Sequence, residues 1–266
     1  MNTILLAILL VAGLGLLAGL ILAVASILMA VPTDEKVEAL KELLPGANCG
    51  ACGYSGCEGY ATAMAKGEAA VGLCSPGGAA VAKSTGEVLG VDGKVELKTA
   101  LVLCGGCEEF TKRKLEYHGL PSCAAAIQFY GGDWLCQYGC LGYGDCVAVC
   151  EYGAITIENG LAKVDPALCR GCTKCAKACP KQLISMQGGG AKGVVRCANH
   201  DKGALTRKAC TVGCIGCGKC TKVCEYDAIH VENFLASIDP EKCVGCGKCA
   251  EACPSKCISV FGSAAG

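Results

Sequence analysis

The segment CIGCGKCTKVC at residues 214–224, followed by CVGCGKCAEACP at residues 243–254, decides the fold. Each run has the spacing C-x2-C-x2-C-x3-C, and a proline follows the second run. Three cysteines around a loop can cover one face of a cubane iron–sulfur cluster, and a short helix can carry the fourth across to a neighbouring cluster. The segment therefore predicts two [4Fe–4S] clusters, one on Cys214, Cys217, Cys220 and Cys253 and the other on Cys243, Cys246, Cys249 and Cys224.

The residues between the two runs support this interpretation. Residues 228–231 and 235–238 flank a short turn, which predicts a β-hairpin packed over the clusters. The cysteine spacing is that of bacterial two-cluster ferredoxins, in which the fourth cysteine of each run ligates the other cluster. We therefore expect residues 191–266 to form one two-cluster unit.

An internal repeat predicts a second such unit. Residues 123–179 match residues 197–253 at a constant offset of 74 without a gap. The first copy carries Asn159-Gly160 between its runs, which is a strong signal for a hairpin turn. Seven cysteines of the first copy correspond to cysteines of the second, namely Cys140, Cys146, Cys150, Cys169, Cys172, Cys175 and Cys179.

The first copy departs from the pattern at Tyr143, which stands where the second copy has Cys217. One set is complete, on Cys150, Cys169, Cys172 and Cys175. The other set, on Cys140, Cys146 and Cys179, lacks a fourth ligand. Either that cluster holds three irons or another cysteine completes it, and Cys136 is the nearest candidate in the sequence.

A separate cysteine set lies nearer the N-terminus. Cys49, Cys52 and Cys57 are followed after sixteen residues by Cys74, and glycines between the first three let the backbone wrap tightly. Four thiolates also suit tetrahedral zinc, but zinc sites more often show two CxxC pairs, so we favour a [4Fe–4S] cluster. We expect a helix over residues 34–44 before this set and another over residues 58–70 beside the cluster.

Several cysteines remain outside these sets. Cys104, Cys107, Cys123 and Cys136 could form a sixth four-thiolate site, unless Cys136 completes the set at Tyr143. In that case the sixth site would need Cys197, Cys210 or Cys107. Cys123 and Cys136 correspond to Cys197 and Cys210 at the same offset, so we expect equivalent positions in the two copies. Cys257 fits no set, and we interpret it as a structural thiol. The sequence thus predicts at least five clusters and favours six.

The composition agrees with metal centres. The chain has 266 residues with 26 cysteines and only 5% aromatic residues, which is too few for a large conventional core. A secreted disulfide scaffold is the alternative, but cysteines in close runs converge on a metal more readily than they pair. The formal net charge is zero, so nothing indicates binding to nucleic acid.

The N-terminal segment is long and apolar. Residues 3–31 contain no charged side chain, and as a helix they would exceed the thickness of a bilayer core. No basic residue precedes the segment, so a retained anchor fits better than a cleaved signal peptide. Lys36 and Lys41 follow it, and the positive-inside rule then places residues 34–266 in the cytoplasm, on a single-pass protein of the plasma membrane.

We therefore expect an α+β chain with an N-terminal transmembrane helix, a small [4Fe–4S] domain and two tandem two-cluster ferredoxin-like units. Residues 77–100 are rich in glycine and are interpreted as a loop or hairpin that links two domains. The expected divisions are 1–31 for the anchor, 32–76 for the N-terminal cluster domain, 77–100 for the linker, 101–135 for a cysteine-containing segment, 136–190 for the first unit and 191–266 for the second.

Along its whole length the chain resembles the B subunit of the Rnf complex, an ion-translocating ferredoxin:NAD oxidoreductase. The resemblance rests on the order of the apolar anchor, the segment CGACGYSGC at 49–57, the segment YGCLGYGDC at 138–146 and the tandem repeats. It implies that the chain takes electrons from reduced ferredoxin and passes them to membrane and flavin-bearing subunits, while Na⁺ or H⁺ crosses the membrane. NAD would bind elsewhere, and indeed no GxGxxG dinucleotide motif or acid–base constellation is visible here.

Two further expectations follow. The alternative function is a membrane-anchored polyferredoxin that serves another redox enzyme, such as a hydrogenase or a formate dehydrogenase. If an acidic ferredoxin is the donor, basic side chains near the cluster segments are candidates for docking, against the simpler interpretation as solvated surface charge. These are Lys112, Arg113, Lys114, Lys174, Lys177 and Lys181.

Overall fold

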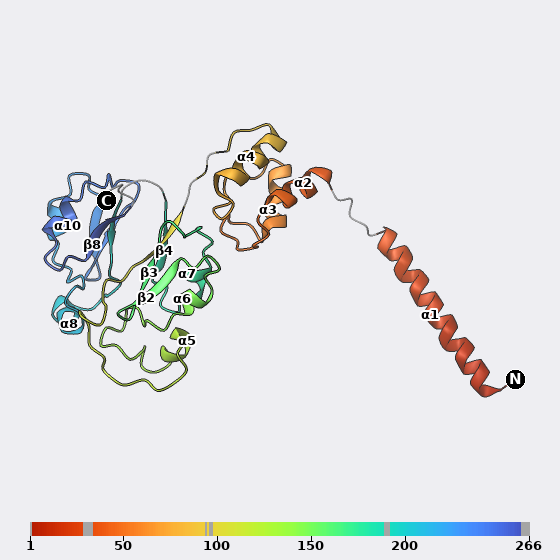
Figure 1. Ribbon diagram of the computed structural model, residues 1–266, viewed down its shortest axis with the longest axis horizontal. Coiled ribbons are helices and arrows are strands. Elements are labelled where there is room, and N and C mark those ends of the chain that lie inside the picture. Colours follow the sequence, from red (N-terminus) through yellow and green to blue (C-terminus); the bar gives the residue numbers. More distant parts are fainter. Residues whose placement is uncertain (1, 29–33, 94, 96–97, 189–191, 262–266) are drawn as a thin grey trace.

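The computed structural model describes residues 2–28, 34–93, 95, 98–188 and 192–261. Helix α1, Thr3–Leu28, is apolar on every side, and its segment Ala7–Ala25 has a mean hydropathy of 2.8. None of that segment is buried against the protein, and α1 stands apart from the other elements (Figure 1). Its length and composition suffice to cross a bilayer, as a single-pass anchor requires.

The N-terminal domain consists of three helices, α2 (Glu35–Leu43), α3 (Cys57–Ala65) and α4 (Gly78–Leu89). The Asp34 side chain accepts a hydrogen bond from the N–H of Lys36 at 3.0 Å and caps α2. Apolar faces of the three helices meet in one buried cluster, formed by Leu40, Leu44, Tyr60, Ala61, Met64, Val71 and Ala82. The helices expected before and beside the first cysteine set are thus present.

The prediction of a loop or hairpin over residues 77–100 was wrong for residues 78–89, which form α4. Ala82 and Thr85 on its buried face pack toward the core of the N-terminal domain, and the Thr85 hydroxyl donates to the carbonyl of Val81 at 2.7 Å. Gly90 ends the helix in the left-handed conformation at φ 69°. A high glycine content hid a helix because these glycines lie at its ends and on its tightly packed side.

Two structurally similar units follow, and we call residues 98–188 the first unit and residues 192–261 the second. Their short strands and helices recur in the same order (Figure 1). In the first unit these are β1 (Thr99–Val102), α5 (Cys123–Ala126), α6 (Asp145–Ala148), β2 (Ile155–Glu158), β3 (Leu161–Val164), α7 (Lys174–Ala178) and β4 (Ile184–Gln187). In the second they are β5 (Lys192–Val195), α8 (Gly203–Ala209), α9 (Lys219–Lys222), β6 (Ile229–Glu232), β7 (Leu235–Ile238), α10 (Lys248–Ala252) and β8 (Ile258–Phe261).

Each unit contains two antiparallel two-stranded sheets. Strands β2 and β3 form the hairpin predicted at Asn159-Gly160, and β6 and β7 form its counterpart in the second unit. The other sheet joins the ends of each unit, because β1 pairs with β4 and β5 pairs with β8. Most elements of the second unit lie 74 residues after their counterparts in the first unit, whereas β5 lies 93 residues after β1. The first unit is therefore longer between its first strand and its first cysteine run.

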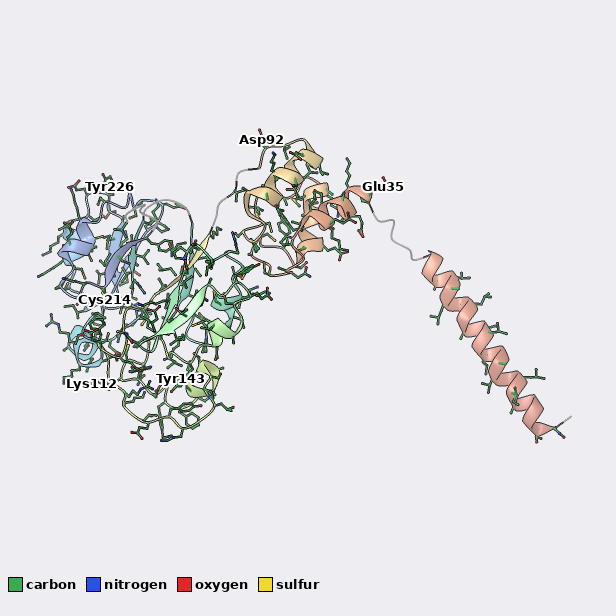
Figure 2. All side chains as sticks on the ribbon, in the orientation of Figure 1. Glu35, Asp92, Lys112, Tyr143, Cys214 and Tyr226 are labelled. Atoms are coloured by element: carbon green, nitrogen blue, oxygen red, sulfur yellow. The ribbon has the colours of Figure 1, made fainter. Side chains whose placement is uncertain are left out.

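The extra length of the first unit forms a small subdomain with its own core. Trp134, Leu141 and Ala126 are buried there, and the Arg113 guanidinium stacks over the indole ring of Trp134 at 4.2 Å. The same segment contacts the second unit, because the Thr111 hydroxyl donates to the carbonyl of Ala209 at 2.7 Å. Outside α1, Glu35 of the N-terminal domain and Tyr226 of the second unit lie at opposite ends of the molecule (Figure 2).

Candidate iron–sulfur sites

Two cavities in the second unit are lined by the cysteines that the spacing groups together. Helices α9 and α10 each follow a glycine in the left-handed conformation, so the chain turns tightly between the second and third cysteines of each run. The structure thus brings both predicted sets together, interleaved as the spacing requires. One cavity is bordered by Cys214, Cys217, Cys220 and Cys253, and the other by Cys224, Cys243, Cys246 and Cys249.

Backbone amides point at the sulfur atoms of these sets. The N–H of Ala236 donates to Cys214 Sγ at 3.4 Å, and the N–H of Gly193 donates to Cys243 Sγ at 3.2 Å. Such hydrogen bonds stabilise negative charge on a thiolate or on the cluster that it holds. If clusters are held by these two sets, such backbone amides would influence their reduction potentials.

The complete set of the first unit is also brought together. Burial, with the neighbouring thiols Cys169, Cys172 and Cys150, raises the pKa of Cys175 to about 11. A thiol with this pKa keeps its proton at neutral pH, and metal binding would displace that proton. The N–H of Ala100 in β1 donates to Cys169 Sγ at 3.4 Å, so this set lies under the sheet that closes the unit.

At the gap left by Tyr143 the structure brings Cys123, and not Cys136, into the cavity of the incomplete set. Cys123 lines one cavity with Cys140, Cys146 and Cys179. Burial, with the neighbouring thiols of Cys140, Cys123 and Cys179, raises the pKa of Cys146 to about 12. The sulfur of Cys123 comes from the start of α5, which precedes the first cysteine run of this unit.

Tyr143 itself serves the small subdomain. Its hydroxyl lies 2.9 Å from the Asp133 carboxylate, and its ring meets the ring of Tyr117 edge-on at 5.5 Å. Asp133 also forms an ion pair with Arg113. The position that carries a cysteine in the second unit is thus used here to anchor the segment that delivers Cys123.

The four cysteines of the N-terminal domain surround one site as well. Burial is the main reason that the pKa of Cys74 is raised, and the thiols of Cys49, Cys57 and Cys52 add to it. The Tyr60 hydroxyl holds the segment before Cys74, since it donates to the carbonyl of Ala70 at 2.8 Å and accepts from the N–H of Leu73 at 3.1 Å.

The N-terminal domain contacts the first unit at a cysteine set. Lys177 of α7 donates from Nζ to the carbonyl of Cys49 at 2.8 Å. A Cβ atom added to Gly171 would lie 2.3 Å from the carbonyl oxygen of Lys98 and 3.2 Å from Cβ of Ser75. Gly171 and Ser75 adjoin Cys172 and Cys74 in the sequence, so two candidate cluster sites face each other here.

Comparisons with known proteins agree with this arrangement. A family model described as an Fe–S cluster matches residues 44–76, and two models of a 4Fe–4S dicluster domain match residues 168–229 and 213–257. The B subunit of the Na⁺-translocating ferredoxin:NAD⁺ oxidoreductase complex of Acetobacterium woodii is 44% identical over 92% of this chain and 74% of its own length. The B subunit of the proton-translocating complex of Clostridium ljungdahlii is 40% identical over 90% of this chain and 85% of its own length. The B subunit of the ion-translocating oxidoreductase complex of Methanosarcina acetivorans is 40% identical over 94% of this chain and 95% of its own length.

The chain belongs to the family of B subunits of ion-translocating ferredoxin:NAD⁺ oxidoreductase complexes. It is therefore an iron–sulfur electron-transfer subunit of such a complex and works with the other subunits. Its apolar helix α1 fits a single-pass anchor in a membrane-associated complex.

In this member of the family, the expected grouping of the remaining cysteines needs correction. Cys123 does not lie with Cys104 and Cys107, because it lines the cavity of Cys140, Cys146 and Cys179. Cys123 and Cys197 are also not equivalent, although a constant offset relates them. The equivalent of Cys197 is Cys104, because each stands two residues after the strand that opens its unit, β5 or β1. Strands β1 and β5 establish this equivalence in the structure, but they are too short to be matched from the sequence alone.

Cys257 lies beside the set of Cys214. It is 4% exposed, and its Sγ lies 3.6 Å from Cys253 Sγ in the same cavity. The position equivalent to Cys257 in the first unit is Leu183, which is also buried. Burial of the side chain is common to both units, which agrees with the interpretation of Cys257 as a structural thiol.

Most of the basic side chains suggested for docking make internal contacts. Lys114 and Lys181 donate from Nζ to the carbonyls of Tyr130 at 2.8 Å and Gly131 at 2.7 Å, respectively. Arg113 forms an ion pair with Asp133, and Lys174 forms one with Glu151. Lys177 donates from Nζ to the carbonyl of Cys49. Five of the six side chains thus have a partner within the protein, and their use in docking stays a prediction.

We expect Asp145→Ala to loosen the helix that carries Cys123. The Asp145 carboxylate accepts hydrogen bonds from the N–H groups of Cys123 and Ala124, both at 2.9 Å, and from the Ser122 hydroxyl at 3.1 Å. Removing this charged cap should lower the stability of the cluster-bound chain by about 2–3 kcal/mol. Faster loss of cluster absorbance on mild heating would measure the effect, and an unchanged rate would contradict it.

Proposed function

We propose that this chain accepts electrons from reduced ferredoxin at its second unit and passes them through [4Fe–4S] clusters toward its N-terminal domain and the membrane. One observation carries this proposal. All 26 cysteines lie in the described residues, and two of them are exposed, Cys217 and Cys246. Both belong to the second unit, where a cluster edge would come closest to a soluble donor.

In the first unit, the positions equivalent to Cys217 and Cys246 are shielded from solvent. Cys172, the counterpart of Cys246, is buried at 8% exposure next to the contact with the N-terminal domain. The counterpart of Cys217 is Tyr143, whose ring packs against the small subdomain. Electron tunnelling slows steeply with distance, so a soluble carrier would exchange electrons far more readily with the second unit than with the first.

Five clusters follow from the cysteine sets, four of them in two tandem two-cluster units. The donor chemistry fits, because four thiolates in each set match the ligands of a cubane cluster. The ligands would be Cys49, Cys52, Cys57 and Cys74 in the N-terminal domain; Cys150, Cys169, Cys172 and Cys175, and Cys123, Cys140, Cys146 and Cys179 in the first unit; Cys214, Cys217, Cys220 and Cys253, and Cys224, Cys243, Cys246 and Cys249 in the second. Each bound cluster would take up and release one electron.

The spacing of the sulfur atoms supports clusters over zinc. Across the described ranges, no three histidine, cysteine or acidic side chains converge closely enough to hold a single ion. The cysteines of a set instead surround an internal cavity, as at Cys123 and at Cys214. A polynuclear cluster needs such an opening between its ligands, whereas one zinc ion draws four sulfurs together.

The position of the anchor supports the direction of electron flow. The N-terminal domain follows α1 directly in the sequence, while the second unit lies beyond the first unit (Figure 1). Lys36 and Lys41 after the anchor favour a cytoplasmic location for the three cluster-bearing parts. Electrons that leave the N-terminal domain would pass to membrane and flavin-bearing subunits of the complex, and NAD would bind there.

Docking of an acidic ferredoxin would use lysines beside the exposed cysteines. Lys219 and Lys222 lie at the two ends of α9, which follows Cys217, and both are exposed. We expect the double variant Lys219→Ala/Lys222→Ala to be reduced about three- to tenfold more slowly by ferredoxin at low salt, with a smaller difference at high salt. Stopped-flow measurement of cluster bleaching at several ionic strengths would test this.

Lys83 offers a matched control, because it is an exposed lysine on α4 of the N-terminal domain. Lys83→Ala should leave the rate and its salt dependence unchanged. An unchanged rate in the Lys219/Lys222 variant at every ionic strength would contradict entry at the second unit. Dithionite, which needs no docking surface, should reduce all three proteins equally.

A further inference from the structure

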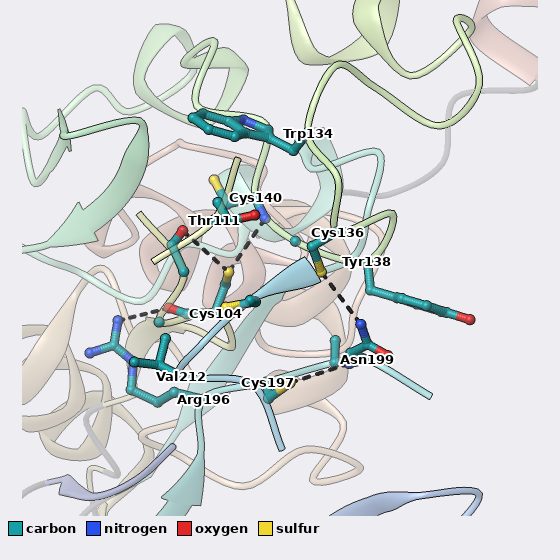
Figure 3. Close-up of a pocket in the computed structure, with 16 residues that line it drawn as sticks. Cys104, Thr111, Trp134, Cys136, Tyr138, Cys140, Arg196, Cys197, Asn199 and Val212 are labelled. Carbon is teal, nitrogen blue, oxygen red and sulfur yellow. Dashed lines mark hydrogen bonds between the residues drawn. The ribbon is translucent and has the colours of Figure 1, made fainter. Parts of the chain in front are cut away.

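A pocket between the two units is lined by four cysteines that belong to none of the five sets. Cys104 and Cys136 come from the first unit, and Cys197 and Cys210 come from the second. Figure 3 shows Cys104, Cys136 and Cys197 around this pocket. Cys104 and Cys210 are each 7% exposed. The fifth remaining thiol of this region, Cys107, does not line the pocket and packs against the core of the first unit.

The four cysteines form two equivalent pairs. Cys104 and Cys197 each follow the opening strand of their unit by two residues, and β1 and β5 pair in the same register with β4 and β8. Cys136 and Cys210 each precede the first cysteine of their unit's run by four residues. Each unit thus presents the same two thiols to the shared pocket.

The hydrogen bonds around the sulfur atoms repeat as well. The N–H of Cys140 donates to Cys104 Sγ at 3.5 Å, and the N–H of Cys214 donates to Cys197 Sγ at 3.3 Å. These contacts are the same in kind as the amide contacts to sulfur in the sets described above. They provide donors that stabilise thiolates in a buried place.

Asn199 adds a buried donor to this pocket. It is 1% exposed, its Nδ2 lies 3.6 Å from Cys136 Sγ, and its N–H donates to Cys197 Sγ at 3.4 Å. Its Oδ1 accepts from the N–H of Asp201 at 2.6 Å, which fixes the amide with its NH₂ group toward the sulfur. An NH₂ group held in this orientation would stabilise negative charge on the Cys136 thiolate, or on a cluster that this sulfur binds.

Two glycines keep the space between the sulfurs open. A Cβ atom on Gly106 would lie 3.1 Å from Cys210 Sγ and 3.8 Å from Cys104 Sγ. One on Gly139 would lie 3.6 Å from Cys136 Sγ and 3.7 Å from Cys104 Sγ. Each glycine thus stands between two sulfur atoms, where a side chain would intrude on the pocket.

We propose that a sixth [4Fe–4S] cluster binds between the two units, held by Cys104, Cys136, Cys197 and Cys210. This site differs from the grouping of Cys104, Cys107, Cys123 and Cys136 that the sequence spacing allows, because each unit contributes two ligands. The proposal adds to the proposed function and does not depend on where ferredoxin docks.

A cluster at this place would connect the clusters of the two units into one continuous row. Cys140, a ligand of the first unit, lines both this pocket and the cavity of Cys123. On the other side, the backbone of Cys214, a ligand of the second unit, is hydrogen-bonded to Cys197. One electron would pass from a reduced cluster of the second unit to this cluster and then to the first unit, with no bond formed or broken.

The test is an iron and sulfide count on the full-length, anaerobically purified protein and on three serine variants. We expect about twenty-four irons per wild-type chain and about four fewer in Cys136→Ser and in Cys210→Ser. Cys107→Ser is the matched control, since it removes a nearby thiol outside the pocket and should lose no iron. Electron paramagnetic resonance after dithionite reduction would show that the other clusters of each variant remain.

Several results would overturn the proposal. A wild-type count of about twenty irons, or one bound zinc in place of the missing four, would exclude the sixth cluster whatever the variants do. Loss of iron in Cys107→Ser but not in Cys136→Ser or Cys210→Ser would assign the site to other ligands. The wild-type count does not require any variant to fold. Reduction of the second unit by ferredoxin is measured separately, so failure of either proposal leaves the other standing.

Discussion

Cys123→Ser is expected to remove one cluster from the first unit and to interrupt electron transfer along the chain. The variant leaves Cys140, Cys146 and Cys179 without the fourth sulfur in their shared cavity. The iron content should fall by about one to four atoms per chain, depending on whether a three-iron cluster survives. Ferredoxin should still reduce the second unit, but reduction of the N-terminal cluster should become much slower.

The sequence offers a rescue for this variant. Tyr143 stands at the position of Cys217, so Tyr143→Cys in the Cys123→Ser background would supply a sulfur where the regular spacing places it. We expect this double variant to regain iron, although it loses the contact between Tyr143 and Asp133. Iron analysis and freeze-quench paramagnetic resonance would follow both steps. Full iron retention in Cys123→Ser alone would falsify the assignment of Cys123 as a ligand.

Gly171→Ala is expected to destabilise the first unit at the place where the N-terminal domain contacts it. Its added Cβ would lie 2.3 Å from the carbonyl oxygen of Lys98, a backbone atom that cannot rotate away. Gly171 also has φ +65°, where an L-residue carries a strain of about 1 kcal/mol. The clash adds to this strain, so the total loss of stability should reach about 3 kcal/mol or more.

Gly153→Ala is a control that separates the backbone strain from the steric clash. Gly153 has a similar φ of +60°, and no atom lies within 4 Å of its added Cβ. This control should show only the backbone strain, so its apparent melting temperature should exceed that of Gly171→Ala by about 4–8 °C. Circular dichroism and the loss of cluster absorbance on heating would measure the difference. Equal melting temperatures would show that the contact at Lys98 contributes nothing.

The features that the sequence predicted best are local ones. The hairpin at Asn159-Gly160 and its counterpart at Asn233-Phe234 follow from turn chemistry and short apolar strands. The interleaved sets of the second unit follow from spacing, because a short loop and a short helix leave the chain little freedom between neighbouring cysteines. Such geometry is fixed within a few residues and needs no knowledge of tertiary packing.

The features that the sequence did not predict depend on long-range packing. Cys123 reaches Cys140 only because Trp134, Leu141 and Tyr143 build a small core that turns the intervening chain back. The constant offset linked Cys123 to Cys197, yet β1 and β5 show that the first unit carries additional residues before its run. Helix α4 was hidden for a related reason, because its glycines allow close packing and its apolar face is short.

Duplication of one unit gave two carriers whose surroundings then diverged. The second unit keeps Cys217 and Cys246 open to solvent, whereas in the first the matching places hold a packed tyrosine and a cysteine covered near the N-terminal domain. In the proposed row of clusters, the burial of Cys172 and the packed ring of Tyr143 would insulate the first unit. An electron on its way to the N-terminal domain would then exchange little with other soluble carriers. Such insulation would protect the yield of energy coupling, because a short circuit would release the same electrons without moving an ion.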